Sequence, residues 1–132
     1  MSNVRAVIAG HGDFATGLMS AAVQITGRDD VFVPMSNRGL SAADVAATLT
    51  RLLDDTGATV VFTDLPAGSC TMAARRLQRD RPGLTVVVGV NLATLLDFIF
   101  DEQESGAAAR HAAERGRAAL TVLTSGGPPR GA

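Results

Sequence analysis

Four short apolar runs alternate with longer helical patterns along the chain, and this alternation restricts the possible folds more than any other feature of the sequence. The runs cover residues 4–9, 31–35, 58–63 and 84–90. The third run is almost continuously apolar, as expected for a strand that is covered on both faces. Strands that alternate with helices predict a parallel sheet with helices on both of its sides.

Helical patterns occupy the segments between and after these runs. Apolar residues recur at helical spacing over residues 14–27, 41–57, 69–79, 92–100 and 105–115. Ser41 begins a sequence typical of a capping box, and Gly57 is placed to end the same helix. We expect Ser69 to cap the third helix and Gly116 to end the last one.

The architecture that we expect from this pattern is a flavodoxin-like open sheet of the α/β class, with strand order 2-1-3-4. Residues 118–124 predict a fifth strand, and the Gly- and Pro-rich residues 125–132 predict a disordered tail. The sequence has no internal repeat and no linker, so residues 1–124 are expected to form a single domain.

Charge and composition exclude several classes of function. The net charge of −1, from 12 basic and 13 acidic residues, gives no overall field that would gather nucleic acid or an anionic membrane. Every basic residue is Arg, and the absence of Lys excludes a Schiff base. Asn91 and Asp97 interrupt the longest apolar block, so we expect no membrane insertion. The start of the chain does not resemble a secretory signal and Cys70 is the single cysteine, which together favour the cytoplasm.

Two reactive side chains follow strands that are expected to be neighbours. In an open parallel sheet, ligands bind outside the carboxyl ends of the strands, where the strand order reverses. For the order 2-1-3-4 this reversal falls between the first and third strands. His11 follows the first of these and Asp64 follows the third, so both side chains are expected in one crevice.

The residue types at this crevice favour phosphoryl transfer through a histidine. Neutral imidazole is nucleophilic near pH 7 and can carry a phosphoryl group, so His11 is the predicted carrier. A carboxylate on the other ring nitrogen fixes the tautomer and offsets the positive charge that develops on attack, which is the role predicted for Asp64. Because the carboxylate also favours the protonated ring, we expect the pair to be moderate and partly solvated.

A phosphoryl group also needs hydrogen-bond donors. The backbone N–H groups of Gly68, Ser69 and Cys70 lie at a predicted helix start, where free amides and the helix dipole favour anions. The Ser69 hydroxyl is a further candidate donor, unless it caps its own helix. The glycines on both sides of His11 would let the backbone of another protein approach closely.

Each of these residues also has a purely structural interpretation, in which it holds a turn or caps a helix. Under that alternative the protein is a non-catalytic, flavodoxin-like module that binds an anion. His111 is predicted to be a solvated helix residue with no role, and the arginines of residues 75–81 form either a solvated face or a docking patch. Two distant histidines and one cysteine are too few for structural zinc, and we expect no metal and no cofactor.

Three segments resemble the enzyme IIA components of the mannose class of the bacterial phosphoenolpyruvate-dependent sugar phosphotransferase system. They are Val-Ile-Ala-Gly-His-Gly at residues 7–12, Phe-Thr-Asp-Leu-Pro-Ala-Gly-Ser at residues 62–69, and Val-Gly-Val-Asn-Leu at residues 88–92. The resemblance extends over residues 4–124. It is moderately specific, because the three motifs occur together at the spacing of the family.

The resemblance implies that His11 accepts phosphate from the histidine of the carrier protein HPr and passes it to an enzyme IIB domain, through a phosphohistidine intermediate. Asp64 corresponds to the active-site aspartate of the family, and Ser69 to the hydroxyl residue of its Asp-x-x-Gly-Gly-Ser motif. Members of the family are typically homodimers that exchange their last strand, which implies that role for residues 118–124.

The chain departs from the family pattern in one loop. Ala67 stands where the family usually has the first of two glycines, Pro66 makes the loop stiffer, and Cys70 stands where the family commonly has Pro. These changes put the identity of the IIB partner in doubt. The same chemistry would also serve a phosphorylation-state regulator or the phosphoryl donor of dihydroxyacetone kinase. No sugar is implied, because a IIA carrier does not touch the sugar.

Overall fold

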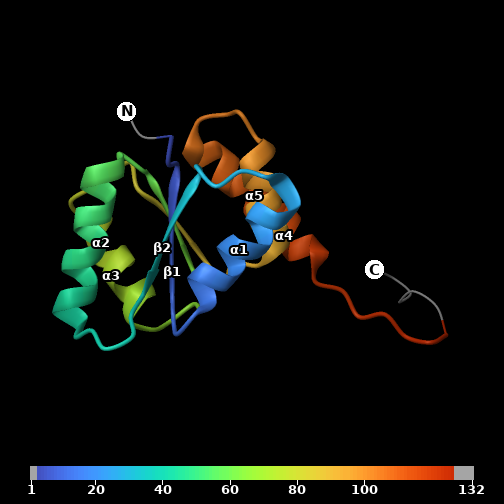
Figure 1. The fold of residues 1–132 in the computed structure, drawn as a ribbon, viewed down its shortest axis with the longest axis horizontal. Helices are drawn as coiled ribbons and strands as arrows, with labels where there is room; N and C mark the ends of the chain where they lie inside the picture. The colour runs from blue at the N-terminus through green and yellow to red at the C-terminus, as the bar shows by residue number, and fades with distance from the viewer. Residues whose placement is uncertain (1–2, 127–132) are drawn as a thin grey trace.

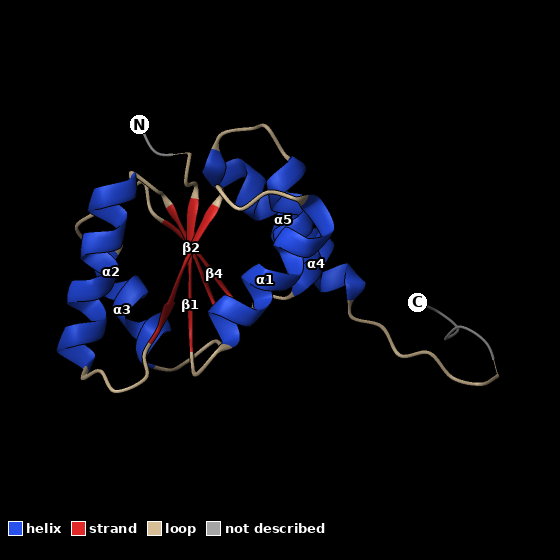
Figure 2. Ribbon diagram, viewed as in Figure 1, coloured by secondary structure: helices blue, strands red, loops and turns tan. Residues whose placement is uncertain are grey.

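The structure is a computed structural model that describes residues 3–126. All the helices and the first four strands predicted from the sequence are present, with shifts of a few residues at their ends (Figures 1 and 2). They are β1 (Ala6–Gly10), α1 (Phe14–Thr26), β2 (Phe32–Ser36), α2 (Ala42–Thr56), β3 (Val60–Thr63), α3 (Ser69–Leu77), β4 (Thr85–Val88), α4 (Leu92–Phe100) and α5 (Ser105–Ala119). None of the described helices combines the length and the apolar character needed to cross a membrane.

The four strands form one parallel sheet in the order β2-β1-β3-β4, which confirms the predicted fold class. Ala6 of β1 pairs with Phe32 of β2 on one side and with Val60 of β3 on the other. The strand order therefore reverses between β1 and β3. The carboxyl ends of these strands lie at the lower edge of the sheet in the view of Figure 1.

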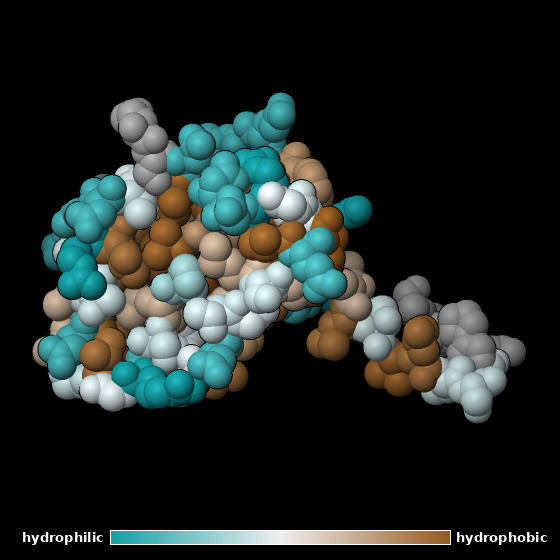
Figure 3. Space-filling view, in the orientation of Figure 1, coloured by the Kyte–Doolittle hydropathy of each residue, from teal (hydrophilic) through white to brown (hydrophobic). Residues whose placement is uncertain are grey.

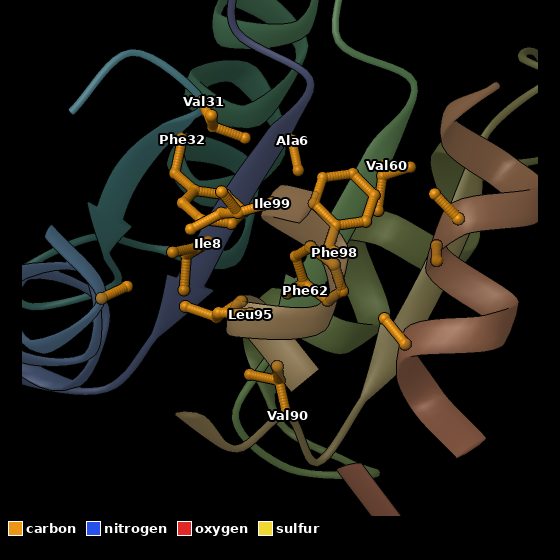
Figure 4. Packing of buried hydrophobic residues seen from close by; sticks show 14 of the residues in the cluster. Ala6, Ile8, Val31, Phe32, Val60, Phe62, Val90, Leu95, Phe98 and Ile99 are labelled. Atoms are coloured by element: carbon orange, nitrogen blue, oxygen red, sulfur yellow. The ribbon is translucent and has the colours of Figure 1, made fainter. Parts of the chain in front are cut away.

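Helices cover both faces of the sheet. α1, α4 and α5 pack on one face, and α2 and α3 pack on the other (Figure 1). Successive side chains of β1 serve the two layers, so Ile8 packs toward the first group of helices and Val7 toward the second. The first layer contains Phe32, Phe62 and Phe98, whose ring centroids lie 5.1–6.1 Å apart (Figure 4). Because helices pack on both faces of the sheet, the strands and the residues at their ends are held in fixed positions.

The segment predicted as a fifth strand does not join this sheet. α5 continues to Ala119, and the following residues up to 123 form neither helix nor strand. Leu120, Val122 and Leu123 are 84%, 72% and 78% exposed. Figure 3 shows hydrophobic side chains on this segment as it leaves the body of the molecule. A strand needs a partner edge for its backbone groups, and residues 120–123 are not part of any described strand. The predicted tail falls largely on residues 127–132, outside the described part of the chain.

Gly116 lies inside α5, and the prediction that it ends the helix is wrong. An added Cβ at this position would lie 1.8 Å from Thr94 Oγ1 and 2.8 Å from Asn91 Oδ1. The Gly116 carbonyl accepts a hydrogen bond of 2.8 Å from Asn91 Nδ2. Close packing of α5 on the start of α4 therefore explains the glycine, and its local sequence signal is the same as that of a helix end.

Replacement of Gly116 is expected to destabilise the fold. Gly116→Ala should lower the free energy of unfolding by about 1–3 kcal/mol, because the methyl group forces Thr94 out of a packed site. The measurement is urea unfolding. Gly17→Ala is the matched control, since an added Cβ there meets nothing within 4 Å; it should stabilise α1 by about 0.5–1 kcal/mol. Equal effects at the two positions would contradict this account of Gly116.

Candidate active site

The predicted pair of reactive side chains meets at the carboxyl edge of the sheet. His11 directly follows β1 and Asp64 directly follows β3, and these strands are hydrogen-bonded neighbours. The distance from His11 Nδ1 to Asp64 Oδ2 is 2.7 Å. The same carboxylate oxygen accepts a hydrogen bond of 2.9 Å from the His11 backbone N–H. Asp64 therefore holds both the turn and the ring of His11.

This contact determines which ring nitrogen is available for chemistry. An ionised carboxylate can only accept hydrogen bonds, so in the neutral tautomer that this contact selects, Nδ1 of His11 carries the proton and Nε2 has the lone pair. The His11 side chain is 53% exposed, whereas the Asp64 side chain is only 10% exposed. The pair is thus partly solvated, mainly through the His11 ring.

The electrostatics of Asp64 keep the carboxylate charged. Burial on its own would raise the pKa of Asp64, but the hydrogen bonds from the His11 ring and the His11 backbone outweigh burial. The pKa of this carboxyl therefore lies below its ordinary value. Asp64 stays ionised, and able to accept from Nδ1, well into the mildly acidic range.

Gly10 has an intramolecular reason to lack a side chain. An added Cβ would lie 2.9 Å from Phe14 Cδ2 and 3.0 Å from Asp64 Oδ2. Gly10 therefore leaves space for the carboxylate that binds His11. Gly12 has a φ of +52°, a conformation that favours glycine. Contacts within the chain therefore explain Gly10, and the backbone conformation explains Gly12.

The first turn of α3 faces the free edge of the His11 ring. An added Cβ at Gly68 would lie 3.2 Å from His11 Cε1 and 3.9 Å from Nε2. The amides of a first helical turn have no acceptor within the helix, and the helix dipole makes this end positive. The structure thus places Gly68, directly before the first residue of α3, next to the His11 ring.

The prediction that Ser69 caps α3 is wrong. The N-cap is Gly68, with φ 119° and ψ 169°, and Ser69 is the first helical residue. The Ser69 hydroxyl accepts a hydrogen bond of 2.8 Å from Asn37 Nδ2 instead of one from its own helix. Glycine takes the cap position because a side chain there would meet both an unfavourable φ and the His11 ring.

Gly68→Ala is expected to displace the His11 ring. The new methyl group would lie 3.2 Å from Cε1, which is closer than an unstrained contact. Proton–nitrogen correlation spectra of the histidine rings should show shifted His11 signals and unchanged His111 signals. The control is Gly39→Ala, which also has a positive φ (+73°) but no atom within 4 Å of the added Cβ. His11 signals that move equally in both variants would argue against the contact.

The Cys70 side chain is buried and does not serve as a nucleophile. It is 1% exposed, and burial, together with the nearby charge of Asp64, raises the pKa of the thiol. A protonated, buried thiol is a poor nucleophile. Cys70 is therefore a small buried residue of the layer that contains α2 and α3.

Two site residues were not identified from the sequence. Asn37, just beyond β2, donates to Ser69 and also uses its backbone N–H to donate to the Gly10 carbonyl at 3.1 Å. Arg38 places Nη2 3.2 Å from Asp13 Oδ1, beside the turn that contains Gly12. The available signal was their position after the second strand, because the carboxyl ends of parallel strands share one edge of the sheet.

His111 is part of a separate ion-pair group between α4 and α5. Its Nδ1 lies 2.9 Å from Asp97 Oδ2 and 3.5 Å from Asp101 Oδ2. Each of the three side chains offers an atom of a kind that binds metals, all within 4.8 Å of one another, a grouping that we did not predict. Asp97 also lies 3.7 Å from Arg115, and both carboxylate oxygens of Asp101 accept hydrogen bonds from Gln103. These contacts connect the two helices.

Comparison with known proteins gives one family. The sequence model of the EIIA-man family, described as the PTS system fructose IIA component, matches residues 5–113. No curated protein matches the chain.

Several solved structures share the fold. One is a mannose/sorbose specific IIA subunit of the phosphotransferase system from Enterococcus faecalis, with 22% identity and a TM-score of 0.79, covering 94% of this chain and 96% of that one. The phosphotransferase system component EIIA from Streptococcus agalactiae has 22% identity and a TM-score of 0.80, with 90% and 96% covered. A PTS IIA protein associated with the fucose utilization operon of Streptococcus pneumoniae has 21% identity and a TM-score of 0.77, with 92% and 96% covered.

Proposed function

The chain belongs to the EIIA-man family of phosphotransferase system IIA components, and from this premise we propose that His11 carries a phosphoryl group from phospho-HPr to an enzyme IIB domain. Membership makes the protein a component of sugar phosphotransfer. The donor, the acceptor and the phosphohistidine intermediate are the proposed parts. A cytoplasmic location follows from these partners.

The observation that carries this proposal is the hydrogen bond that Asp64 makes with one nitrogen of the His11 ring. Asp64 occupies Nδ1 at 2.7 Å, the His11 side chain is 53% exposed, and an added Cβ at Gly68 would lie 3.9 Å from Nε2. In the proposed reaction, the lone pair of Nε2 attacks the phosphorus atom held on the donor imidazole. The new N–P bond forms as the old one breaks, and Asp64 stabilises the positive charge that develops on the His11 ring.

The start of α3 supplies donors to the phosphoryl oxygens in this proposal. The backbone N–H groups from Gly68 to Cys70 lie at the positive end of α3. An added Cβ at Gly68 would lie 3.9 Å from Nε2, which supports their assignment as donors. The Ser69 hydroxyl does not cap its own helix and can add a further hydrogen bond. No metal ion or cofactor is needed for this transfer, because both reacting groups are imidazoles.

The experiment that tests the function is reconstitution of the transfer chain. The protein is incubated with phosphoenolpyruvate, enzyme I and HPr of the same genome, and the product is tested for an acid-labile phosphoryl group. We expect labelling that is lost when the IIB partner is added. A wild-type protein that takes no label would favour the alternative of a non-catalytic anion-binding module.

We also propose a homodimer in which the part of the predicted strand that follows α5, residues 120–124, pairs with a second subunit. The apolar side chains of Leu120, Val122 and Leu123 are exposed on one chain. β4 is an edge strand of the described sheet, and its Val88 is 40% exposed. An exposed apolar segment and an open strand edge are complementary features.

A further inference from the structure

Asn37 makes hydrogen bonds to two segments of the candidate active site, the turn that contains His11 and the start of α3. Its backbone N–H donates to the carbonyl of Gly10, directly before His11, at 3.1 Å. Its side-chain Nδ2 donates to Ser69 Oγ, at the start of α3, at 2.8 Å. Asn37 and Ser69 are both partly buried. The adjacent Cys70 thiol, a weak acceptor, is a further side chain that the Ser69 hydroxyl reaches.

The direction of the Asn37–Ser69 bond has a chemical consequence. An amide nitrogen only donates, so Ser69 Oγ accepts in this bond and keeps its own hydrogen for another acceptor. Ser69 is not the N-cap of α3, and its hydroxyl therefore does not accept from the helix amides. The hydroxyl belongs to the residue that directly follows Gly68, where an added Cβ would lie 3.2 Å from Cε1 of the His11 ring. An oxygen of a phosphoryl group bound to Nε2 could accept the hydrogen of the Ser69 hydroxyl.

We propose that Asn37 is a positioning residue for phosphoryl transfer, which holds the Ser69 hydroxyl as an acceptor so that its hydrogen is donated to a phosphoryl oxygen on His11. This inference rests on the proposed carrier function. Asn37 acts through Ser69 and does not touch the reacting atoms. The hydrogen bond from the Asn37 backbone N–H to Gly10 does not involve the side chain. Replacing the side chain therefore removes the contact with Ser69 but keeps the support of the turn that contains His11.

The test reverses the direction of this hydrogen bond without changing its length. In Asn37→Asp the carboxylate can only accept, so it takes the Ser69 hydrogen that the wild-type protein offers to the phosphoryl group. Single-turnover transfer from phospho-HPr should slow by about 10- to 100-fold, the effect of losing one hydrogen bond to a charged group. Asn37→Ala should slow it less, because Ser69 is then free to rotate.

Coupling to Ser69 distinguishes positioning from a structural role. In a Ser69→Ala background, Asn37→Ala should have no further effect on the transfer rate, and the loss caused by Asn37→Asp should shrink. Urea unfolding of each variant checks that the fold is retained. Ser36→Ala is the control in the same loop, since it removes the acceptor of the Arg38 backbone N–H but does not touch Ser69; its rate should match the wild type.

Two results would overturn the inference while leaving the carrier function intact. One is wild-type transfer by Asn37→Asp. The other is an equal slowing by Asn37→Asp with and without the Ser69 hydroxyl, which would show that the added charge acts alone. If the wild-type protein accepts no phosphoryl group from phospho-HPr, the carrier function and this inference both fail, and that result is recognised before any variant is compared.

Discussion

His11→Ala is expected to abolish phosphorylation by phospho-HPr. The substitution removes the only imidazole at the sheet edge, and no neighbouring group of the site replaces it: the Cys70 thiol is buried and protonated, and the Asp64 carboxylate loses the ring that it holds. The fold should persist, because the His11 side chain is 53% exposed and its backbone N–H can still donate to Asp64. The measurement is transfer of labelled phosphate from phosphoenolpyruvate through enzyme I and HPr.

The chain contains its own control for this experiment. Its second histidine, His111, also pairs with an aspartate, at 2.9 Å, but lies between α4 and α5. His111→Ala should therefore accept phosphate at the wild-type rate. Labelling that survives in His11→Ala and disappears in His111→Ala would move the site to the other end of the fold.

Asp64→Asn is expected to leave the protein folded and to slow phosphoryl transfer by about 100-fold or more, by analogy with other carboxylates that orient a catalytic imidazole. The amide cannot offset the charge that develops on the ring. If its NH₂ group faces Nδ1, it also imposes the wrong tautomer, because Nε2 then carries the proton. The measurement is the single-turnover rate of transfer from phospho-HPr.

The pH dependence of stability gives a second test of Asp64. Because the pKa of Asp64 is lowered in the folded state, its contribution to stability is fully present above the pKa of an unfolded carboxyl and is lost as the pH falls through the lower, folded value. The difference in unfolding free energy between the wild type and Asp64→Asn should therefore shrink as the solution is acidified. The control is Asp55→Asn, at an exposed carboxylate in α2, which should leave the transfer rate unchanged. An unchanged rate in Asp64→Asn would remove Asp64 from the mechanism.

The sheet and the main pair of the site could be predicted because local patterns determine them. An apolar run such as residues 58–63 is too short for a buried helix, and its helical flanks predict a parallel sheet. The end of each strand then places the next residue at one edge, which is why His11 and Asp64 were predicted to meet. Ser41 was predicted as a helix cap from its spacing to Asp44, and its hydroxyl accepts from the Asp44 backbone N–H at 3.1 Å.

The remaining features depend on contacts between distant segments. The sequence could not distinguish Gly116 from a helix end, because this position requires glycine to make room for Thr94 of another helix. Gly68 displaces Ser69 from the cap position since the His11 ring occupies the adjacent space. Asn37 was missed because its partner is Ser69, 32 residues away. Residues 118–124 have the composition of a strand, but composition cannot supply the edge that a strand pairs with.

The position of phosphate on the His11 ring tests the central claim most directly. Phosphorus and nitrogen NMR of the phosphorylated protein, labelled with ¹⁵N-histidine, distinguishes the two ring nitrogens. The phosphoryl group should lie on Nε2, with Nδ1 still protonated and bound to Asp64. A phosphoryl group on Nδ1, or on any residue other than His11, would contradict the account, because Asp64 occupies Nδ1 at 2.7 Å.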